Sequence, residues 1–530
     1  MGRLRPAWPL AAALVLGLGV FLIREHQLAG VAGFPLDDSW IHLRFARNLA
    51  EGQGFAYNPG VPVSGSTAPL WTLLLGALFR LVGSEPLFAK AAGSAAALAA
   101  AWLAARLTLE WTADRSAAAV AGVLTALAGP LLWGALSGME VTLAAALVTG
   151  GLLAHVTGRD LVAAALLALA VLARPESVLV FVLVWAAGAW SPRRAAIFAL
   201  ALAVVVGPWV AFNLATVGSP LPATAAAKIE GGLVSVLSGH PESPSSFSMK
   251  HPWRYLVEWV EWLDTVNALL PFMIPPGLWL LWRRGGRRFL LPGAALVLHP
   301  LAMALLASFR GPGFQEGRYS IHLLPLAAAV ATLPLAALTA WGKASSAPPA
   351  APRQLSRLLA AGLVVAALAG LWPAATRYGW AVQNIEAMQG HLGRWVAANT
   401  PPDARLALND VGAIGYLSRR EVVDVMGLVT PAITPYRRDG ELGVLRYLER
   451  ACPDYLIIFP RWFPRLTAMP ERFTPIYRVR LNRNTTAGAE EMVVYETVWN
   501  HANPAPRPCP EGPRASTMGG DADSSFLTPR

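Results

Sequence analysis

Two adjacent carboxylates, Asp37 and Asp38, are the residues of this sequence best placed to do chemistry. They follow the first apolar run and precede residues 39–49, where apolar and polar side chains alternate as in a helix lying at a membrane interface. A carboxylate there can act as a general base toward a hydroxyl group, because the lowered dielectric raises its pKa. A solvated helix cap is the alternative, and it is the commoner use of an acidic pair.

Other ionisable residues interrupt apolar stretches. Glu140 stands at the expected start of a helix, where the helix dipole favours a carboxylate without any substrate. Arg174 and Glu176 flank Pro175, and charges at such depth are usually paired. We interpret them as a structural ion pair across a kink, with a lipid-phosphate path as the alternative.

The histidines give no metal-binding pattern. His42, His251 and His322 are too scattered along the chain for a metal triad. The acidic residues of the polar segments are few, so no metal site is expected, and a divalent cation is left open as a cofactor.

The elements that must position these residues are membrane helices. Of 530 residues, 55% are hydrophobic and only 14% charged, against roughly 25% charged in a soluble domain. Long apolar blocks separated by short polar stretches exclude an ordinary cytosolic enzyme and a disordered chain. The net charge of +11 comes from basic residues in short loops between these blocks, which is the positive-inside pattern and not a nucleic-acid-binding one.

About eleven transmembrane helices are expected, and Arg3 and Arg5 place the N-terminus in the cytoplasm. An odd number of spans then places everything after residue 375 on the outer side. The short segments in 108–176 allow a re-entrant piece there. The candidate spans are residues 8–23, 68–83, 86–107, 116–135, 141–156, 161–190, 195–217, 265–282, 289–308, 321–341 and 358–375.

The long polar segments of the protein are expected on the outer side of the membrane. The transmembrane domain, residues 1–375, has large outer loops at 24–67 and 218–264, and residues 376–502 have the periodicity of a soluble α/β domain. Strands are expected at 405–408, 422–425, 455–459, 477–481 and 492–498, and a helix at 441–451. The tail, 503–530, is expected to be disordered. Cys452 and Cys509 are either joined outside the membrane or two free thiols.

Several ordered motifs resemble those of bacterial polytopic glycosyltransferases of the C superfamily (GT-C). The first is LDDSWIHLRFARNLAEGQGFAYNPGVPVSGSTAPLWT at residues 36–72, which is similar to the first outer loop of that family. Most similar is the group of the mycobacterial arabinofuranosyltransferase that adds terminal arabinose to the cell wall. Further motifs in the same order are SGME at 137–140, ARPE at 173–176, GSPLPATAAAK at 218–228, GRYSIHLLPL at 317–326 and DVGAIGYLSRREVVDVMGLVTP at 410–431.

The resemblance implies a transferase of the bacterial inner membrane that takes a sugar, arabinofuranose or mannose-like, from a polyprenyl-phosphate donor. The acceptor would be an extracytoplasmic glycan, glycolipid or protein. Inverting transfer needs one carboxylate as base, and Asp37 or Asp38 supplies it. Cations must stabilise the departing phosphate, and the candidates are Lys228, Arg318 and Arg44.

Each candidate cation has a structural alternative. Arg318 and Tyr319 suit an interfacial anchor, and Lys228 a solvated loop charge. We place His42, Glu140, Arg174, Glu176 and Tyr319 as residues that support the site.

Two other classes of protein remain as alternatives. A transporter would show inverted repeats with matching polar breaks, which we do not find in the sequence. In a non-catalytic protein that binds glycan or a lipid-linked polymer, the outer domain would bind the glycan and the acidic pair would have no catalytic role. As an enzyme, the chain is expected to use that domain to tune acceptor choice, so that its removal leaves donor hydrolysis intact.

Overall fold

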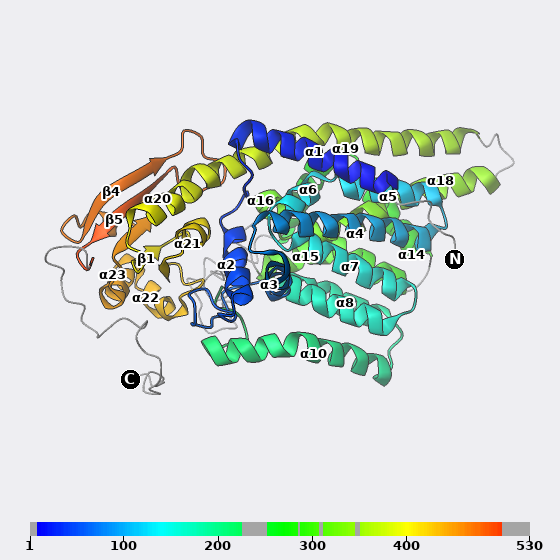
Figure 1. Cartoon of the computed structure of the whole chain (residues 1–530). Helices are drawn as coiled ribbons and strands as arrows, with labels where there is room; N and C mark the ends of the chain where they lie inside the picture. Colours follow the sequence, from blue (N-terminus) through cyan, green and yellow to red (C-terminus); the bar gives the residue numbers. More distant parts are fainter. Residues whose placement is uncertain (1–7, 225–251, 285–286, 307–310, 345–349, 501–530) are drawn as a thin grey trace.

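The structure, a computed structural model, describes residues 8–224, 252–284, 287–306, 311–344 and 350–500. A bundle of helices carries a smaller sheet-containing domain at one end (Figure 1). Helix α1 (Trp8–Ala29) lies beside α19 (Ala350–Ile385), and α1 begins at the end of the bundle away from the sheet. The prediction of a mainly α membrane protein with a C-terminal α/β domain is confirmed.

The bundle is built from apolar helices that overlap the predicted spans. The remaining helices are α4 (Leu87–Thr112), α5 (Arg115–Leu127), α6 (Gly129–Leu136), α7 (Val141–Val156), α8 (Asp160–Ala173), α9 (Val178–Ala187), α10 (Pro192–Val217), α13 (Pro252–Val266), α14 (Leu270–Arg283), α15 (Arg287–Leu306), α17 (Leu324–Ala331) and α18 (Leu333–Ala344). Large apolar side chains are exposed on the outer face of α10, among them Leu200 and Val204, each 64% exposed. Such a face suits contact with lipid.

The length and composition of the observed helices support fewer membrane spans than the eleven expected from the apolar pattern of the sequence. In the parts of the chain that are described, five helices are long and apolar enough to cross a membrane, or up to seven if two bent pairs each count as one. Five shorter apolar helices accompany them. The number eleven stays a prediction.

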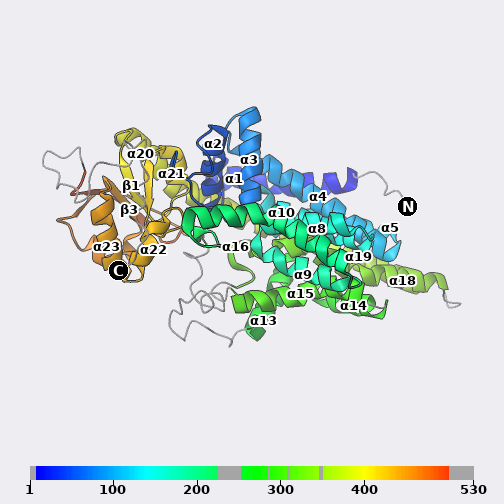
Figure 2. The same ribbon diagram turned by 90° about the horizontal axis from the view of Figure 1, so that it is seen from below.

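Several predicted spans have a different form in the structure. Residues 116–135 are divided between α5 and α6, which are bent by 53°, and residues 321–341 between α17 and α18. Residues 161–190 divide at Arg174, which takes an extended conformation (φ −150°, ψ 119°) before Pro175, since proline disfavours helical backbone in the residue before it. The predicted span at 68–83 is α3 (Pro69–Val82), which is seen end-on in Figure 1 and upright in Figure 2. Helices α8 and α10 run from side to side in both views. Helix α3 therefore lies across the bundle, and its 14 residues, about 21 Å long, are short for a ~30 Å bilayer core.

The outer domain contains a five-stranded mixed sheet of order β2-β1-β3-β5-β4. Its strands are β1 (Arg405–Leu408), β2 (Glu421–Asp424), β3 (Tyr455–Ile458), β4 (Phe473–Arg480) and β5 (Glu491–Thr497), and helix α23 is Gly440–Ala451. Strand β1 pairs in parallel with β2 and β3, whereas β5 is antiparallel to β3 and β4. These strands lie within a few residues of the predicted ones.

A continuous helical connection joins the two parts of the molecule. Helix α19 runs past residue 375 to Ile385, continues as a π-helical turn, η3 (Glu386–Gly390), and ends in α20 (His391–Asn399). The proposed boundary at 375/376 thus falls inside a helix. The domain limits stay predictions, and the tail from residue 503, Cys509 and most of the loop 218–264 lie outside the described residues.

Candidate active site

Asp37 and Asp38 stand where the bundle meets the outer domain. Asp38 begins helix α2 (Asp38–Ala50), which lies between the bundle and the sheet (Figures 1 and 2). Both carboxylates line a pocket of about 790 Å³ whose walls come from the helical bundle and from the outer domain. A pocket of this size suits a small-molecule substrate.

The Asp37 carboxylate is held by the backbone of the outer domain. The N–H of Gly412 donates to Asp37 Oδ2 at 2.6 Å, and the N–H of Ala413 donates to Oδ1 at 2.7 Å. A Cβ atom at Gly412 would lie 2.6 Å from Asp37 Cγ, so only glycine allows this approach. Residues separated by about 375 positions in the sequence therefore form one site.

Burial makes Asp37 more basic than an ordinary aspartate. Loss of solvent raises its pKa to about 6, against the effect of the two backbone hydrogen bonds, which favour the charged form. The negative charge of Asp38 contributes to the same rise. A carboxylate with such a pKa is ionised at neutral pH and is still able to take up a proton.

Asp38 forms an ion pair with Arg318. Arg318 Nη1 donates to Asp38 Oδ2 at 2.9 Å and to Gln315 Oε1 at 2.7 Å. The guanidinium also lies over the ring of Tyr319, 5.3 Å from its centroid. Arg318 is 4% exposed, and its Nε has no hydrogen-bond partner in the described structure. Asp38 and Gln315, the partners of Arg318, line the pocket, whereas Arg318 itself lies directly behind them and its buried Nε–H group has no acceptor among the described residues.

The loop before Arg318 has unusual backbone geometry. Gln315 (φ 49°), Glu316 (φ 58°) and Gly317 (φ 80°) follow one another in the left-handed region. The first two cost about 1–3 kcal/mol each, as non-glycine residues there do. Arg377 donates two hydrogen bonds to the Glu316 carboxylate, of 2.7 and 2.9 Å, which restrain this loop. Gln315, Glu316 and Arg377 all line the pocket.

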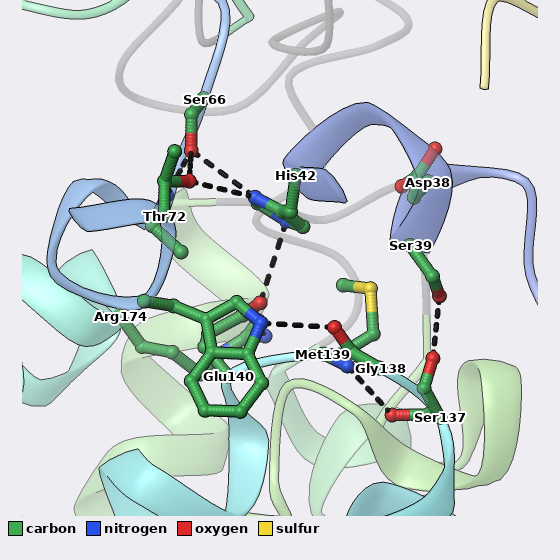
Figure 3. Close-up of polar contacts among 12 residues, drawn as sticks. Asp38, Ser39, His42, Ser66, Thr72, Ser137, Gly138, Met139, Glu140 and Arg174 are labelled. Atoms are coloured by element: carbon green, nitrogen blue, oxygen red, sulfur yellow. Dashed lines mark hydrogen bonds and ion pairs between the residues drawn. The ribbon is translucent and has the colours of Figure 1, made fainter. Parts of the chain in front are cut away.

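Three of the predicted supporting residues, His42, Glu140 and Arg174, form a buried network beneath α2 (Figure 3), which Glu176 and Tyr319 extend. Arg174 donates to Glu140 at 2.5 Å and to Glu176 at 2.8 Å, and its guanidinium lies over Tyr319 at 4.9 Å. His42 Nε2 lies 3.5 Å from the second oxygen of Glu140. None of these five side chains lines the large pocket, so the network fixes α2 and the Arg318 loop from below.

Arg44, predicted as a phosphate ligand, is occupied elsewhere. It is buried and donates to the carbonyl groups of Tyr57, Gly415 and Arg420 and to Asn58 Oδ1. It is absent from the pocket lining, so we assign it a structural role instead. Its hydrogen bonds connect the first outer loop to the outer domain.

Lys228, the other predicted phosphate ligand, lies outside the described residues. The residues described contain no group of three or more His, Cys, Asp or Glu side chains arranged to hold a metal ion. We therefore assign no metal site.

Asp410 and Gln389 are among the pocket residues that the sequence interpretation missed. Asp410 follows β1, whose partner strands are parallel, and the carboxyl ends of parallel strands commonly carry sites. This position after a predicted strand is the sequence feature that could have identified Asp410 as a site residue. Burial, and next the charge of Asp37, raise the pKa of Asp410 well above its usual value.

Comparison with solved structures identifies the architecture. ArnT from Cupriavidus metallidurans matches in its apo state with a TM-score of 0.58 and 14% identity, over 92% of this chain and 98% of that one. Its complex with undecaprenyl phosphate matches with a TM-score of 0.54 and 15% identity, over 94% and 99%. The oligosaccharyltransferase AglB from Archaeoglobus fulgidus, in complex with an inhibitory peptide and a dolichol-phosphate, matches with a TM-score of 0.51 and 12% identity, over 91% and 74%.

The chain has the GT-C fold. The GT-C resemblance inferred from the sequence motifs is thus confirmed for the architecture, and the apolar helices make the chain a multi-pass membrane protein. A family model described as a domain of unknown function (DUF8728) matches residues 380–499, which hold Gln389 and Asp410. The comparison with curated proteins found no match.

Proposed function

We propose that this chain is a membrane glycosyltransferase that moves a sugar from a polyprenyl-phosphate donor to an extracytoplasmic acceptor with inversion. The observation that carries the proposal is the basic carboxylate of Asp37 in a large pocket at the outer-domain end of a GT-C bundle. Two structural neighbours were determined with polyprenyl phosphates bound, undecaprenyl phosphate in ArnT and dolichol-phosphate in AglB.

In the proposed reaction Asp37 takes the proton of an acceptor hydroxyl. The hydroxyl oxygen attacks the anomeric carbon of the donor sugar, and the bond from that carbon to the phosphate oxygen breaks. The departing polyprenyl phosphate keeps the electron pair and is stabilised by the positive charge of Arg318, whose buried Nε has no hydrogen-bond partner among the described residues. Asp38 positions Arg318 through the 2.9 Å ion pair, and Lys228 is proposed as a second phosphate ligand.

The finer assignments are proposals that rest on the sequence. The donor sugar is arabinofuranose or mannose-like, and the acceptor is a glycan, a glycolipid or a protein. The positive-inside pattern supports a cytoplasmic N-terminus, with the outer domain facing away from the cytoplasm of a bacterial inner membrane.

Transfer from labelled donors tests the proposal. Membranes containing the wild type, Asp37→Asn, Asp38→Asn or the control Asp264→Asn, which alters an exposed carboxylate of α13, are incubated with radiolabelled polyprenyl-phosphate mannose or arabinofuranose. We expect Asp37→Asn to lower turnover at least 100-fold, about 2.7 kcal/mol in barrier height, and the control to match the wild type. Binding of donor without turnover in the wild type would favour the non-catalytic alternative, and uptake of intact donor into vesicles would favour a transporter.

A further inference from the structure

The helix that joins bundle and outer domain is interrupted beside the pocket. Turn η3, Glu386–Gly390, is π-helical, with one extra residue in the turn. Such insertions rotate the residues they carry relative to a regular helix and occur frequently at functional sites. Gln389, in this turn, is fully buried within the protein and lines the pocket.

The Gln389 amide is only half used by the protein. Its Nε2 donates to Asp410 Oδ2 at 2.8 Å, and Asn409 Nδ2 donates to Asp410 Oδ1 at 3.2 Å. The other end of the amide, Oε1, has no hydrogen-bond partner among the described residues. A buried acceptor left without a donor is unfavourable, so a group that enters the pocket is expected to supply one.

We propose that Gln389 and Asp410 form a subsite that binds a sugar hydroxyl next to Asp37. A hydroxyl group both donates and accepts a hydrogen bond, so it can donate to Gln389 Oε1 and accept from Asp410 when that carboxyl is protonated. This inference rests on the proposed function, and it assigns a role to two residues of the domain of unknown function.

The surroundings of Asp410 favour its protonated form. The charged groups that act on it are Asp37, Asp38 and Asp424, all of them carboxylates, and each raises its pKa in addition to burial. The hydrogen bond from Gln389 opposes this effect, and the N–H group of Asn409 also favours the ionised form. Two backbone N–H groups limit the rise in the pKa of Asp37 to about 6, whereas the pKa of Asp410 is raised well above its usual value, so Asp37 is the carboxylate of the pair that ionises first.

The hydroxyl has two sources, the donor sugar and the acceptor, and one experiment with two arms distinguishes them. The full-length protein is incubated with radiolabelled polyprenyl-phosphate mannose or arabinofuranose. One arm measures hydrolysis without acceptor, and the other measures transfer to the acceptors of native membranes. The variants are Gln389→Met, which removes both amide groups at similar size, and Gln389→Glu, which keeps an oxygen. The matched control is Gln383→Met, on α19 outside the pocket lining.

We expect Gln389→Met to lower kcat/KM by 10- to 100-fold with an unchanged Tm, and Gln389→Glu to retain more activity. Loss of transfer alone assigns the hydroxyl to the acceptor, and loss of both activities assigns it to the donor sugar. If both activities stay within twofold of the control, the subsite is wrong while the proposed function stands. If both variants lose Tm and activity together, the residue is structural and the subsite is likewise wrong. A wild type inactive on every donor would instead overturn the proposed function.

Discussion

At the scale of single residues, the chemistry depends on how Asp37 is solvated. Burial raises its pKa to about 6, whereas the N–H groups of Gly412 and Ala413 keep it from rising further. The balance gives a base that is mostly ionised at pH 7 and still accepts a proton readily.

A pH profile tests this balance. Because Asp37 must be ionised to act as base, kcat/KM should rise with pH and level off above about 6, the value expected for Asp37. In Asp37→Asn the residual rate should lose this rising limb, whereas Asp264→Asn should keep it. A wild-type rate that is constant from about pH 5 to 8 would contradict the assignment of Asp37 as the base.

Arg318 offers a second test at this scale. We expect Arg318→Gln to raise the KM for the donor by at least tenfold, and Arg318→Lys to raise it less, because lysine keeps the charge but loses the planar donor geometry. Arg254→Gln, at an exposed position of α13, serves as the control. An unchanged donor KM in Arg318→Gln would leave this arginine with the role of an interfacial anchor.

The acidic pair was predictable because it lies in a motif contiguous in sequence. Asp410 and Gln389 were not predictable, because they join the acidic pair only when the fold brings together residues some 350 positions apart. No local sequence pattern predicts the π turn that carries Gln389. Arg44 shows the reverse problem. Its charge suggested a phosphate ligand, but its hydrogen bonds to the carbonyl groups of Gly415 and Arg420 form only when the outer domain folds against α2.

At the scale of elements, the contact between α2 and the DVGAIG segment (410–415) sets the geometry of the site. Two glycines of this segment allow the close approach. A Cβ at Gly412 would collide with Asp37, and one at Gly415 would lie 2.7 Å from Arg44 Nη1. Asn58 extends this contact, since it exchanges two hydrogen bonds with Val422 of strand β2.

Gly412→Ala tests this contact. The added methyl group must displace Asp37, so we expect activity to fall at least tenfold while the membrane bundle stays folded. Gly207→Ala is the control, because its Cβ would meet open space on α10. Full activity of Gly412→Ala at an equal protein level would show that the backbone of Gly412 does not position Asp37.

The elements themselves were largely predictable. Apolar runs located most bundle helices, and alternating patterns located all five strands. The exceptions have physical causes. An extended residue before Pro175 divides one apolar run into two helices, and hydropathy alone does not distinguish a helix that lies across a bundle, such as α3, from one that spans it.

At the scale of the whole molecule, the outer domain is a wall of the pocket. It contributes Asp410, Trp462 and Arg483 to the lining and holds Asp37 by two hydrogen bonds. The sequence alone suggested that its removal would spare donor hydrolysis. The contacts predict that donor hydrolysis would be lost as well. Without the outer domain, Asp37 would lose its hydrogen-bond partners and the pocket would lose one of its walls.

Deletion of the residues after about Arg377 decides between the two expectations. We expect the truncated protein to lose donor hydrolysis as well as transfer, each by at least 100-fold, because the base is no longer positioned. Equal amounts of membrane-inserted protein must be compared. Donor hydrolysis at the wild-type rate in the truncated chain would mean that the bundle alone forms the catalytic site.

The most direct measurement is a density map of full-length Asp37→Asn, which is expected to bind donor without turnover, in complex with a polyprenyl-phosphate sugar. The account predicts the sugar in the pocket lined by Asp37, Asp38 and Asp410, with its anomeric carbon facing residue 37 and its phosphate beside Arg318. A donor whose sugar and phosphate lie outside this pocket, away from residue 37, would contradict it.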